Sequence, residues 1–330
     1  MATNPKATII IPTYNGEKYL DRLLNMVFKQ ELDHPFDVFV IDSTSSDRTV
    51  EIIQTHLKKH KNMTYEQIPT KEFGHGKTRN YAAQIAKGEF VVFLSQDAIP
   101  AKKSWLYEML KPFELNDKIV GVVGKQVPRA ICVPLLKYEI RTVFNNLGSE
   151  AGTALFYKDF FMDDPVYGDV VTFYSDVNSA ARRDFLVNEI PYRDIPYAED
   201  QFFARDIIEA GYMKAYAPRG RVIHSNDIPL FEYRHRTFDE IVGLRRIGAK
   251  IELPSWKHIV KATVLGSLKD AYHASRDKQY SFKRKIFWMV VNPFYHIAKW
   301  RGFRTAVKVD LSDDRTFSKH SLEARRYRKG

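Results

Sequence analysis

The first 100 residues alternate short apolar runs with segments in which apolar side chains recur every three or four positions. Runs rich in β-branched residues predict buried strands at 7–11, 36–41 and 90–94. Helical spacing predicts helices at 17–29, from Thr49 onward and at 78–86. This alternation is typical of βα units, so we expect an α/β domain built on a mainly parallel sheet.

Short polar clusters follow three of the predicted strands. They are Thr13-Tyr14-Asn15, Asp42 to Asp47, and Ser95-Gln96-Asp97. Open α/β sheets bind their ligands beyond the carboxyl ends of parallel strands. We therefore expect the three clusters to contribute to one ligand site.

The distribution of charge divides the chain into two parts. Residues 231–330 hold 23 Lys and Arg against 10 Asp and Glu, whereas the whole chain has a net charge of +11. We expect one domain over 1–230 and a helical, basic region over 231–330. A basic region suits nucleic acid, anionic lipid or a phosphorylated substrate, so charge alone leaves the partner open.

Composition indicates a globular chain in a reducing setting. A length of 330 residues with 44% hydrophobic positions excludes a disordered or fibrous protein. The single cysteine, Cys132, cannot form an internal disulfide framework, which favours the cytoplasm. The N-terminus has no signal-peptide pattern and no apolar run reaches about 18 residues, so we expect no membrane-spanning segment.

Three motifs together carry a resemblance to a known family. They are Ile11-Pro12-Thr13-Tyr14-Asn15-Gly16, Val40-Ile41-Asp42-Ser43 with Ser46-Asp47-Arg48-Thr49, and Gly76-Lys77-Thr78-Arg79-Asn80 before Gly88-Glu89-Phe90. In order and spacing, over about residues 5–230, they resemble the family 2 glycosyltransferases, which have a nucleotide-binding GT-A fold. The resemblance implies an inverting transfer of a sugar from a nucleotide-sugar donor.

The resemblance also implies roles in a nucleotide pocket. Asp42 would accept a hydrogen bond from the base imide, and Arg79 would stabilise the pocket or the phosphates. The nucleoside would be lined by Pro12, Thr13 and Asn15. The residue types allow a structural alternative, in which Asp42 and Asp47 form an Asx turn and a helix cap.

The segment Ser95-Gln96-Asp97-Ala98 lies where the family has its Asp-X-Asp metal motif. Ser95 replaces the first carboxylate, Gln96 would contact the nucleotide, and Asp97 would bind Mg²⁺ or Mn²⁺. His224 follows a short strand-like run and would be a second metal ligand or a phosphate contact. A Ser/Thr-Gln-Asp-Ala segment resembles the rhamnosyltransferase branch, which implies dTDP-rhamnose as donor, with a UDP-sugar as the alternative.

A later acidic motif resembles the one that supplies the family's catalytic base. In Ala198-Glu199-Asp200-Gln201, Asp200 would deprotonate the acceptor hydroxyl and Glu199 would orient the acceptor. Both could instead be first-turn acids that interact with the helix dipole. Within the expected strand 174–183, Asp176 and Asn178 alternate toward one face and would lie near the donor sugar.

The C-terminal part contains an apolar stretch with basic ends. Residues 286–297 lie between Lys283-Arg284-Lys285 and Lys299-Trp300-Arg301. This pattern favours an interfacial helix on anionic lipid, as expected for a lipid-linked saccharide acceptor at the inner face of the cell membrane. The alternative is a core or oligomerisation helix with extended lysines, which would make the chain a homo-oligomer.

Two other function classes stay open at the level of sequence. The basic region would suit a nucleic-acid-binding protein, but the chain has no recognisable nucleic-acid module, so no nucleic-acid partner is expected. Loss of the first carboxylate at Ser95 would suit a catalytically retired scaffold of a polysaccharide assembly. Retention of Asp97 and Asp200 favours an active glycosyltransferase in cell-wall or other cell-surface polysaccharide biosynthesis.

Overall fold

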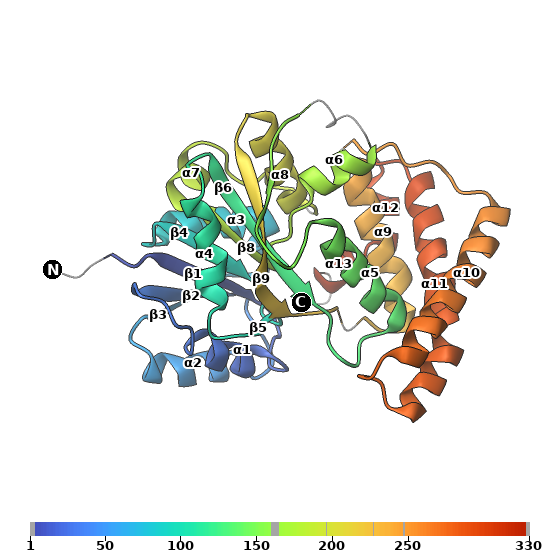
Figure 1. The fold of residues 1–330 in the computed structure, drawn as a ribbon, viewed down its shortest axis with the longest axis horizontal. Coiled ribbons are helices and arrows are strands. Elements are labelled where there is room, and N and C mark those ends of the chain that lie inside the picture. The colour runs from blue at the N-terminus through green and yellow to red at the C-terminus, as the bar shows by residue number, and fades with distance from the viewer. Residues whose placement is uncertain (1–3, 160–164, 196, 227, 247, 328–330) are drawn as a thin grey trace. The chain divides into compact units, whose positions relative to one another are not determined.

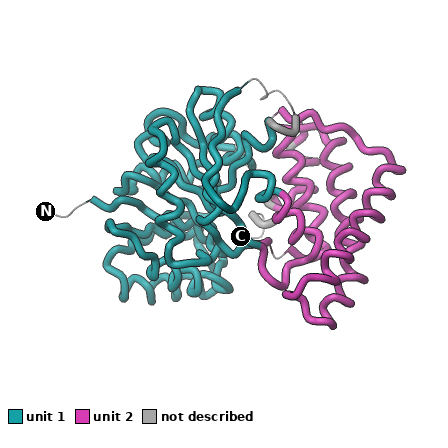
Figure 2. Tube along the Cα trace, viewed as in Figure 1, with its two compact units in different colours: residues 1–127, 143–224 teal, residues 128–142, 225–330 magenta. Residues whose placement is uncertain are grey.

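The computed structural model describes residues 4–159, 165–195, 197–226, 228–246 and 248–327. The chain divides into two compact units, one of residues 1–127 and 143–224 and the other of residues 128–142 and 225–330 (Figure 2). The second unit starts at Ser225 rather than at residue 231. It also takes up residues 128–142, which charge and periodicity had grouped with the first domain.

A nine-stranded sheet organises the described part of the first unit (Figure 1). Its strands are β1 (Ala7–Thr13), β2 (Phe36–Asp42), β3 (Met63–Gln67), β4 (Phe90–Leu94), β5 (Ile99–Pro100), β6 (Ile119–Val127), β7 (Ala154–Phe156), β8 (Asn178–Arg182) and β9 (Met213–Ile223). Their order is β3-β2-β1-β4-β8-β6-β9-β5, and β7 pairs with β9. The three strands predicted from β-branched runs are confirmed.

The first half of the sheet is parallel, as the alternating pattern predicts. β1 pairs in parallel with both β2 and β4, and β2 pairs in parallel with β3. β8 then runs antiparallel between β4 and β6, which makes the whole sheet mixed. The carboxyl ends of β1, β2 and β4 therefore lie along one edge of the sheet.

The first unit also contains helices, several of which pack on this sheet. They are α1 (Leu20–Val27), α2 (Thr49–Lys59), α3 (His75–Ile85), α4 (Trp105–Leu110), α6 (Pro165–Thr172), α7 (Arg183–Asn188) and α8 (Glu199–Glu209), with short 3₁₀ turns at Thr70–Glu72 and Lys111–Glu114. In α1, the predicted apolar positions Leu20, Leu23 and Leu24 are fully buried. They join the strand residues Ile9 and Ile11 in one core cluster.

The second unit is helical, as predicted for the C-terminal region. Its helices are the N-terminal part of α5 (Pro134–Asn146), α9 (Leu230–Arg246), α10 (Trp256–Arg276), α11 (Phe282–Lys308), α12 (Asp314–His320) and α13 (Leu322–Tyr327). α11 packs against both α9 and α10. None of the described helices is long and apolar enough to cross a membrane.

The core of the second unit combines aromatic side chains with a buried polar link. Tyr233 of α9 and Tyr295 of α11 pack edge to face with ring centroids 5.1 Å apart. Asp270 of α10 accepts hydrogen bonds from Asn292 Nδ2 at 2.9 Å and binds His296 Nε2 at 2.8 Å. α11 contains Pro293, which has no backbone N–H group to donate. The side-chain bonds to Asp270 hold α10 against α11 at this point of the helix.

Candidate active site

The ends of β1 and β2 form a hydrogen-bonded floor at the edge of the sheet. The strands are in register at Thr13 and Asp42, and the Thr13 hydroxyl donates to Asp42 Oδ1 at 3.1 Å. Asp42 Oδ2 accepts the Ser45 amide at 2.8 Å, and Oδ1 accepts the Ser45 hydroxyl. The Asp42 carboxylate is completely buried. The structural alternative is therefore present, and a contact to a base imide stays a prediction.

Exposed polar groups lie above this floor. Asn15 is exposed and its side-chain oxygen accepts the Ser46 amide at 2.8 Å, which joins the loops after β1 and β2. Asp47 Oδ1 accepts the Thr49 amide, the first of α2, at 3.0 Å, although the N-cap position itself is Arg48. Pro12, at the penultimate position of β1, is partly exposed. Asn15 and Pro12 thus keep surface that a nucleoside can reach.

Three backbone outliers mark the candidate segments. In the described part of the chain, the residues other than glycine with positive φ are Asn15 (47°), Thr44 (61°) and Ala198 (69°). The first two lie in the loops after β1 and β2, and Ala198 immediately precedes Glu199 and Asp200. Such conformations cost about 1–3 kcal/mol each and cluster at functional sites.

Gln96 fastens the segment after β4 to the segment after β1. Its side-chain oxygen accepts the Tyr14 amide and its side-chain nitrogen donates to the Tyr14 carbonyl, both at 2.9 Å. This pair of hydrogen bonds resembles the pairing between the backbones of two strands, so it sets the distance between the two loops. The structure thus engages the Gln96 amide with backbone, and a direct contact of Gln96 with a nucleotide stays a prediction.

Asp97 and His224 come together through a short strand pair. β5 and β9 align Ile99 with Ile223, and His224 Nε2 lies 3.5 Å from Asp97 Oδ1. On the other side of the ring, His224 Nδ1 donates to Gln126 Oε1 at 2.9 Å, and the Gln126 amide nitrogen donates to Ser175 Oγ at 3.0 Å. The hydrogen bond from His224 Nδ1 to Gln126 orients the imidazole in the way that metal-binding histidines require.

The Asp97–His224 pair has a chemistry suited to Mg²⁺ or Mn²⁺. Asp97 is partly exposed, whereas His224 is only 4% exposed. A carboxylate oxygen and an imidazole nitrogen leave further coordination positions for phosphate oxygens and water. Within the described ranges, no group of three or more His, Cys, Asp or Glu side chains is placed to hold a metal. The donor set fits a metal that is shared with a bound diphosphate.

Helix α3 positions the segment that leads to Asp200. The Asn80 side chain donates to the Tyr192 carbonyl at 2.8 Å and accepts the Tyr192 amide at 3.0 Å. A Cβ atom added at Gly76 would lie 2.2 Å from the Arg193 carbonyl oxygen, so this close approach requires glycine. The motif Gly76-Lys77-Thr78-Arg79-Asn80 therefore holds residues 192–193 against the helix.

Arg79 binds two buried carboxylates. Its NH1 atom donates to Glu199 Oε1 at 2.6 Å, and its Nε lies 3.3 Å from Asp176 Oδ2. The other oxygen of Asp176 accepts hydrogen bonds from Ser179 Oγ at 2.6 Å and Tyr192 OH at 2.8 Å. Burial raises the pKa of Tyr192 well above its ordinary value, so its hydroxyl remains a donor. Arg79 thus holds the two carboxylates together, and its roles in a nucleotide pocket or at the phosphates stay predictions.

Asp200 is the accessible carboxylate of this cluster. Asp176 and Glu199 are 2% and 5% exposed, whereas Asp200 is partly exposed at the first turn of α8. Asp200 Oδ1 accepts the Gln201 amide at 2.8 Å, and Oδ2 accepts the Asp176 amide at 3.3 Å. Burial, together with the neighbouring Glu199 and Asp176 carboxylates, raises the pKa of Asp200 well above its usual range. A raised pKa makes the ionised carboxylate a stronger base, which suits proton removal from an acceptor hydroxyl.

The Asp97–His224 pair and the carboxylates Asp176, Glu199 and Asp200 are linked through one short segment. The Ser95 amide donates to the Val177 carbonyl at 3.1 Å, which places the 95–97 segment beside residues 175–177. From the other end of that segment, Ser175 bonds Gln126, the partner of His224. Residues 175–177 thus connect Asp97, the candidate metal ligand beside the leaving diphosphate, with Asp200, the candidate base.

Asn178 does not share a face with Asp176. β8 begins only at Asn178. The side-chain nitrogen of Asn178 donates to the Gly220 carbonyl at 2.8 Å, and its side-chain oxygen accepts a hydrogen bond from Trp105 Nε1 at 2.9 Å. Asn178 is completely buried, which leaves it no exposed atom for a sugar. Tyr192 and Gln126, which orient Asp176 and His224, were missed by sequence reasoning because they lie in no recognised motif.

The sheet order, the loops at its parallel edge and the acidic cluster define a nucleotide-sugar transferase fold of the GT-A type. The sequence matches the glycosyl transferase family 2 over residues 8–187, and the chain belongs to this family. It is therefore a glycosyltransferase.

Curated relatives include two enzymes from Salmonella. The chain is 35% identical over 239 residues to the O-antigen chain rhamnosyltransferase WbaN of Salmonella anatum, which covers 71% of each protein. It is 32% identical over 237 residues, again 71% of each protein, to the O-antigen chain rhamnosyltransferase RfbN of Salmonella typhimurium. These matches support the resemblance to rhamnosyltransferases.

Solved structures agree on the fold. The mannosyltransferase PcManGT from Pyrobaculum calidifontis, in complex with GDP-Man and Mn²⁺, superposes with a TM-score of 0.59 at 18% identity. That superposition covers 95% of this chain and 89% of the other. Glucosyl-3-phosphoglycerate synthase from Mycobacterium tuberculosis, in complex with Mn²⁺, UDP-glucose and phosphoglyceric acid, gives 0.51 at 17% identity and covers 76% and 82%.

Proposed function

We propose that this glycosyltransferase moves rhamnose from dTDP-rhamnose to a lipid-linked saccharide during cell-surface polysaccharide synthesis. The identity of 35% and 32% to two O-antigen chain rhamnosyltransferases supports the donor sugar and the pathway class. The observation that carries the chemistry is Asp200, a partly exposed carboxylate with a raised pKa beside buried carboxylates. A UDP-sugar is the alternative donor.

In the proposed reaction, Asp200 takes the proton from the acceptor hydroxyl. The acceptor oxygen forms a bond to the anomeric carbon as the bond from that carbon to the donor diphosphate breaks. Attack from the face opposite the diphosphate inverts the configuration. Arg79, by binding Glu199 and Asp176, keeps the neighbouring carboxylates in place while Asp200 reaches the acceptor.

Asp97 and His224 are the residues that would hold Mg²⁺ or Mn²⁺. The bound cation would neutralise charge on the leaving diphosphate. Gln126 orients the imidazole of His224, and the partly exposed Asp97 turns its carboxylate toward that ring. Nucleoside contacts come, in this proposal, from Pro12, Thr13, Asn15 and Asp42.

Transfer assays with a panel of nucleotide sugars test this proposal. The purified enzyme is incubated with dTDP-rhamnose or with UDP-sugars, with and without Mn²⁺, and with a lipid-linked saccharide acceptor. We expect transfer from dTDP-rhamnose to exceed transfer from each UDP-sugar, with an inverted anomeric configuration in the product. Preference for a UDP-sugar would reject the donor, and retention of configuration would reject the role of Asp200.

The same proposal places the enzyme at the cytoplasmic face of the cell membrane, where a lipid-linked acceptor is within reach. Fractionation of cells that produce the protein tests this location. We expect the enzyme in the membrane fraction at low salt and its release by high salt, as for a peripheral protein held by charge. Equal recovery in the soluble fraction at both salt concentrations would reject the location.

A further inference from the structure

Helix α10 carries an apolar ridge that no other described element covers. Val260, Val264, Leu268 and Tyr272 are spaced four residues apart, and each is more than half exposed, between 52% and 63%. Side chains at this spacing follow one face of a helix. Ile259, Asp270 and Ala274 lie on the inward side, where they are buried. The exposed ridge is therefore a separate apolar surface rather than the margin of the core.

Helix α11 repeats this arrangement. Tyr295 is buried and packs with Trp288 in the core of the second unit. In contrast, Phe282, Ile286, Val290 and Phe294 are again spaced four apart and exposed by 50% to 77%. The stretch 286–297 that the sequence marked as interfacial is thus two-faced, and only one of its faces packs against the protein.

The charges on these two helices have a single sign at the surface. Together α10 and α11 contain eleven Lys and Arg and one acidic residue. That acidic residue is Asp270, which is buried and bound to Asn292 and His296. The exposed faces therefore combine apolar ridges with positive charge and present no carboxylate.

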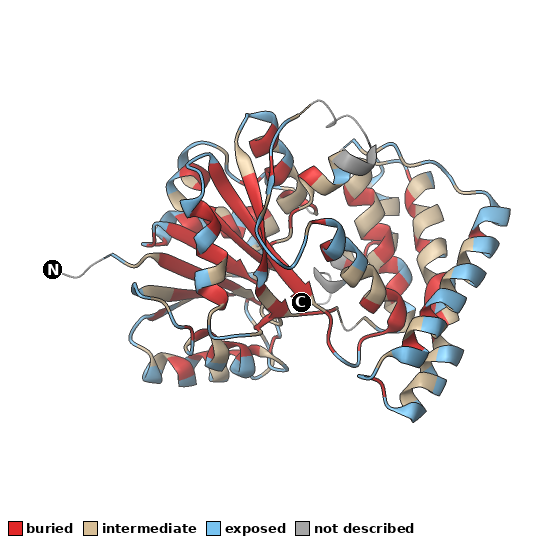
Figure 3. Cartoon of the chain, in the orientation of Figure 1, coloured by how far each residue is buried: buried red, intermediate tan, exposed pale blue. Residues whose placement is uncertain are grey.

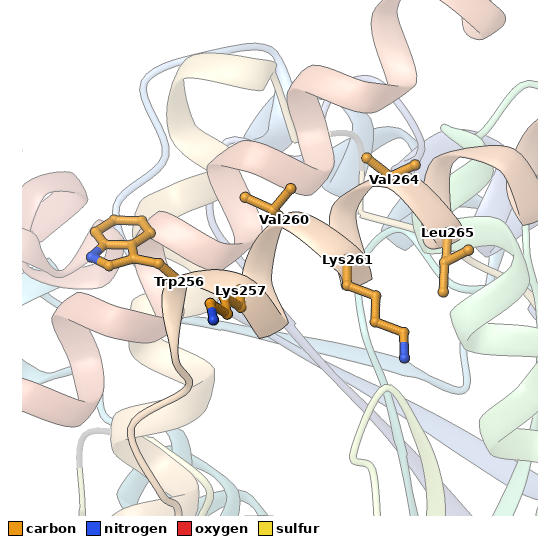
Figure 4. Close-up of a pocket in the computed structure, with 6 residues that line it drawn as sticks. All are labelled: Trp256, Lys257, Val260, Lys261, Val264 and Leu265. Carbon is orange, nitrogen blue, oxygen red and sulfur yellow. The ribbon is translucent and has the colours of Figure 1, made fainter.

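Apolar and cationic side chains alternate closely along α10. Trp256, Lys257, Val260, Lys261, Val264 and Leu265 line a surface hollow of about 640 Å³ (Figure 4). Figure 4 shows Val260 and Val264 on one side of the helix and Lys257 and Lys261 on the other. A lysine with a long aliphatic stem can place its ammonium group at the level of lipid headgroups while its neighbours enter the acyl region.

We propose that the exposed faces of α10 and α11 dock on an anionic lipid leaflet. The partner follows from charge complementarity combined with exposed apolar area, since the ridges would remain in water against a nucleic acid. A second copy of the chain would bring two positive faces together, which Coulomb repulsion disfavours. The inference rests on the proposed lipid-linked acceptor and deepens the proposed function, because it names the helix faces that would contact the lipid.

Vesicle co-sedimentation with the full chain tests this proposal. The vesicles contain either phosphatidylglycerol mixed with phosphatidylcholine or phosphatidylcholine alone. We expect binding to the anionic vesicles, weakening as salt is added, and much weaker binding to the neutral ones. Leu268→Glu should weaken binding to anionic vesicles at least about tenfold, since it removes a large apolar side chain from the ridge.

Two further variants test the role of positive charge and control for the added carboxylate of Leu268→Glu. Lys261→Gln removes one charge and should weaken binding about fivefold. Leu115→Glu is the matched control, because Leu115 is 56% exposed in the first unit, and it should bind as the wild type does. Transfer to a soluble acceptor analogue is measured for each variant. Leu268→Glu with normal transfer but lost vesicle binding supports the docking face independently of the acceptor.

Several outcomes would overturn the proposal. Leu268→Glu that binds vesicles as tightly as Leu115→Glu does would remove α10 from the interface. Equal binding of the wild type to neutral and anionic vesicles would remove the role of charge. A wild-type dimer that Leu268→Glu converts to a monomer, without any vesicle binding, would assign the ridge to a second copy. Failure of transfer from every donor with vesicle binding intact would reject only the proposed function.

Discussion

Replacing Arg79 with methionine removes the cation that two buried carboxylates face. The Arg79 side chain is 10% exposed, and the side chains of Asp176 and Glu199 are 1% and 7% exposed. Methionine keeps much of the volume but cannot bind either carboxylate. Breaking a buried pair by removing one partner typically costs about 3–5 kcal/mol, because the remaining charge has no compensation. We expect a loss of that size in the free energy of unfolding of Arg79→Met.

The pH dependence of this loss follows from the carboxyl groups. Burial raises the pKa of Asp176 and of Asp200 in the folded protein, and the Arg79 cation opposes both increases. An acid whose pKa is raised on folding destabilises the native state as the pH rises above its unfolded value. Without Arg79, the pKa values of Asp176 and Asp200 in the folded protein rise further. The difference in stability between Arg79→Met and wild type should therefore be greatest near neutral pH and shrink below about pH 4.

Urea unfolding at several pH values, followed by intrinsic fluorescence, measures this difference. The matched control is Arg48→Met, because Arg48 pairs with Glu51 at the surface, where the two side chains are 71% and 64% exposed. We expect the control to unfold nearly as the wild type does, since exposed pairs contribute little. A loss below about 1 kcal/mol in Arg79→Met, or a loss that does not change with pH, would refute the role assigned to this network.

Three further predictions concern the chemistry of the site. Asp97→Asn should lower turnover and weaken Mn²⁺-dependent nucleotide binding, because an amide is a poorer ligand for a hard cation; full wild-type activity in EDTA would contradict this metal role. Asp42→Ala should weaken dTDP binding by about 1–3 kcal/mol in titration calorimetry, and unchanged affinity would exclude Asp42 from the site. In the wild type, kcat/KM should fall as the pH drops through the raised pKa of Asp200, which lies above the ordinary carboxyl range. A pH profile in which kcat/KM falls only within the ordinary carboxyl range would contradict the assignment.

The architecture of the first unit was largely predictable because its signals are local. The run 90–94 predicted β4 with its exact bounds, and the strands at 7 and 36 begin where their β-branched runs begin. Helix α1 is shorter than the predicted 17–29, since Tyr19 and Leu20 first form a turn on the Gly16 carbonyl. Burial on the sheet, shown for these strands in Figure 3, is what periodicity detects.

The internal arrangement of the site could not be predicted in the same way. Arg79 and Glu199 are separated by 120 residues, and nothing in either motif states that they form a pair. Asp176 and Asn178 alternate in sequence as if on one strand face, but β8 starts at Asn178 and their side chains bind different elements. The division of units likewise depends on residues 128–142 packing with the C-terminal helices, a contact between distant segments. Figure 3 also shows exposed positions along α10 and α11. The sequence alone does not distinguish these apolar positions from the buried ones on the same helices.

Transfer by Asp200→Asn tests the central claim most directly. The amide keeps the shape of the side chain but cannot accept the proton, and general-base catalysis contributes typically about 10² to 10⁴-fold. We predict a loss of transfer of that size, with donor affinity, measured without acceptor, within a few-fold of wild type. Asp206→Asn is the control on the same helix, since Asp206 pairs with Arg193 at the surface, and it should keep near-normal transfer. Near wild-type transfer by Asp200→Asn, or a collapse of its donor affinity, would contradict the assignment of Asp200 as the base.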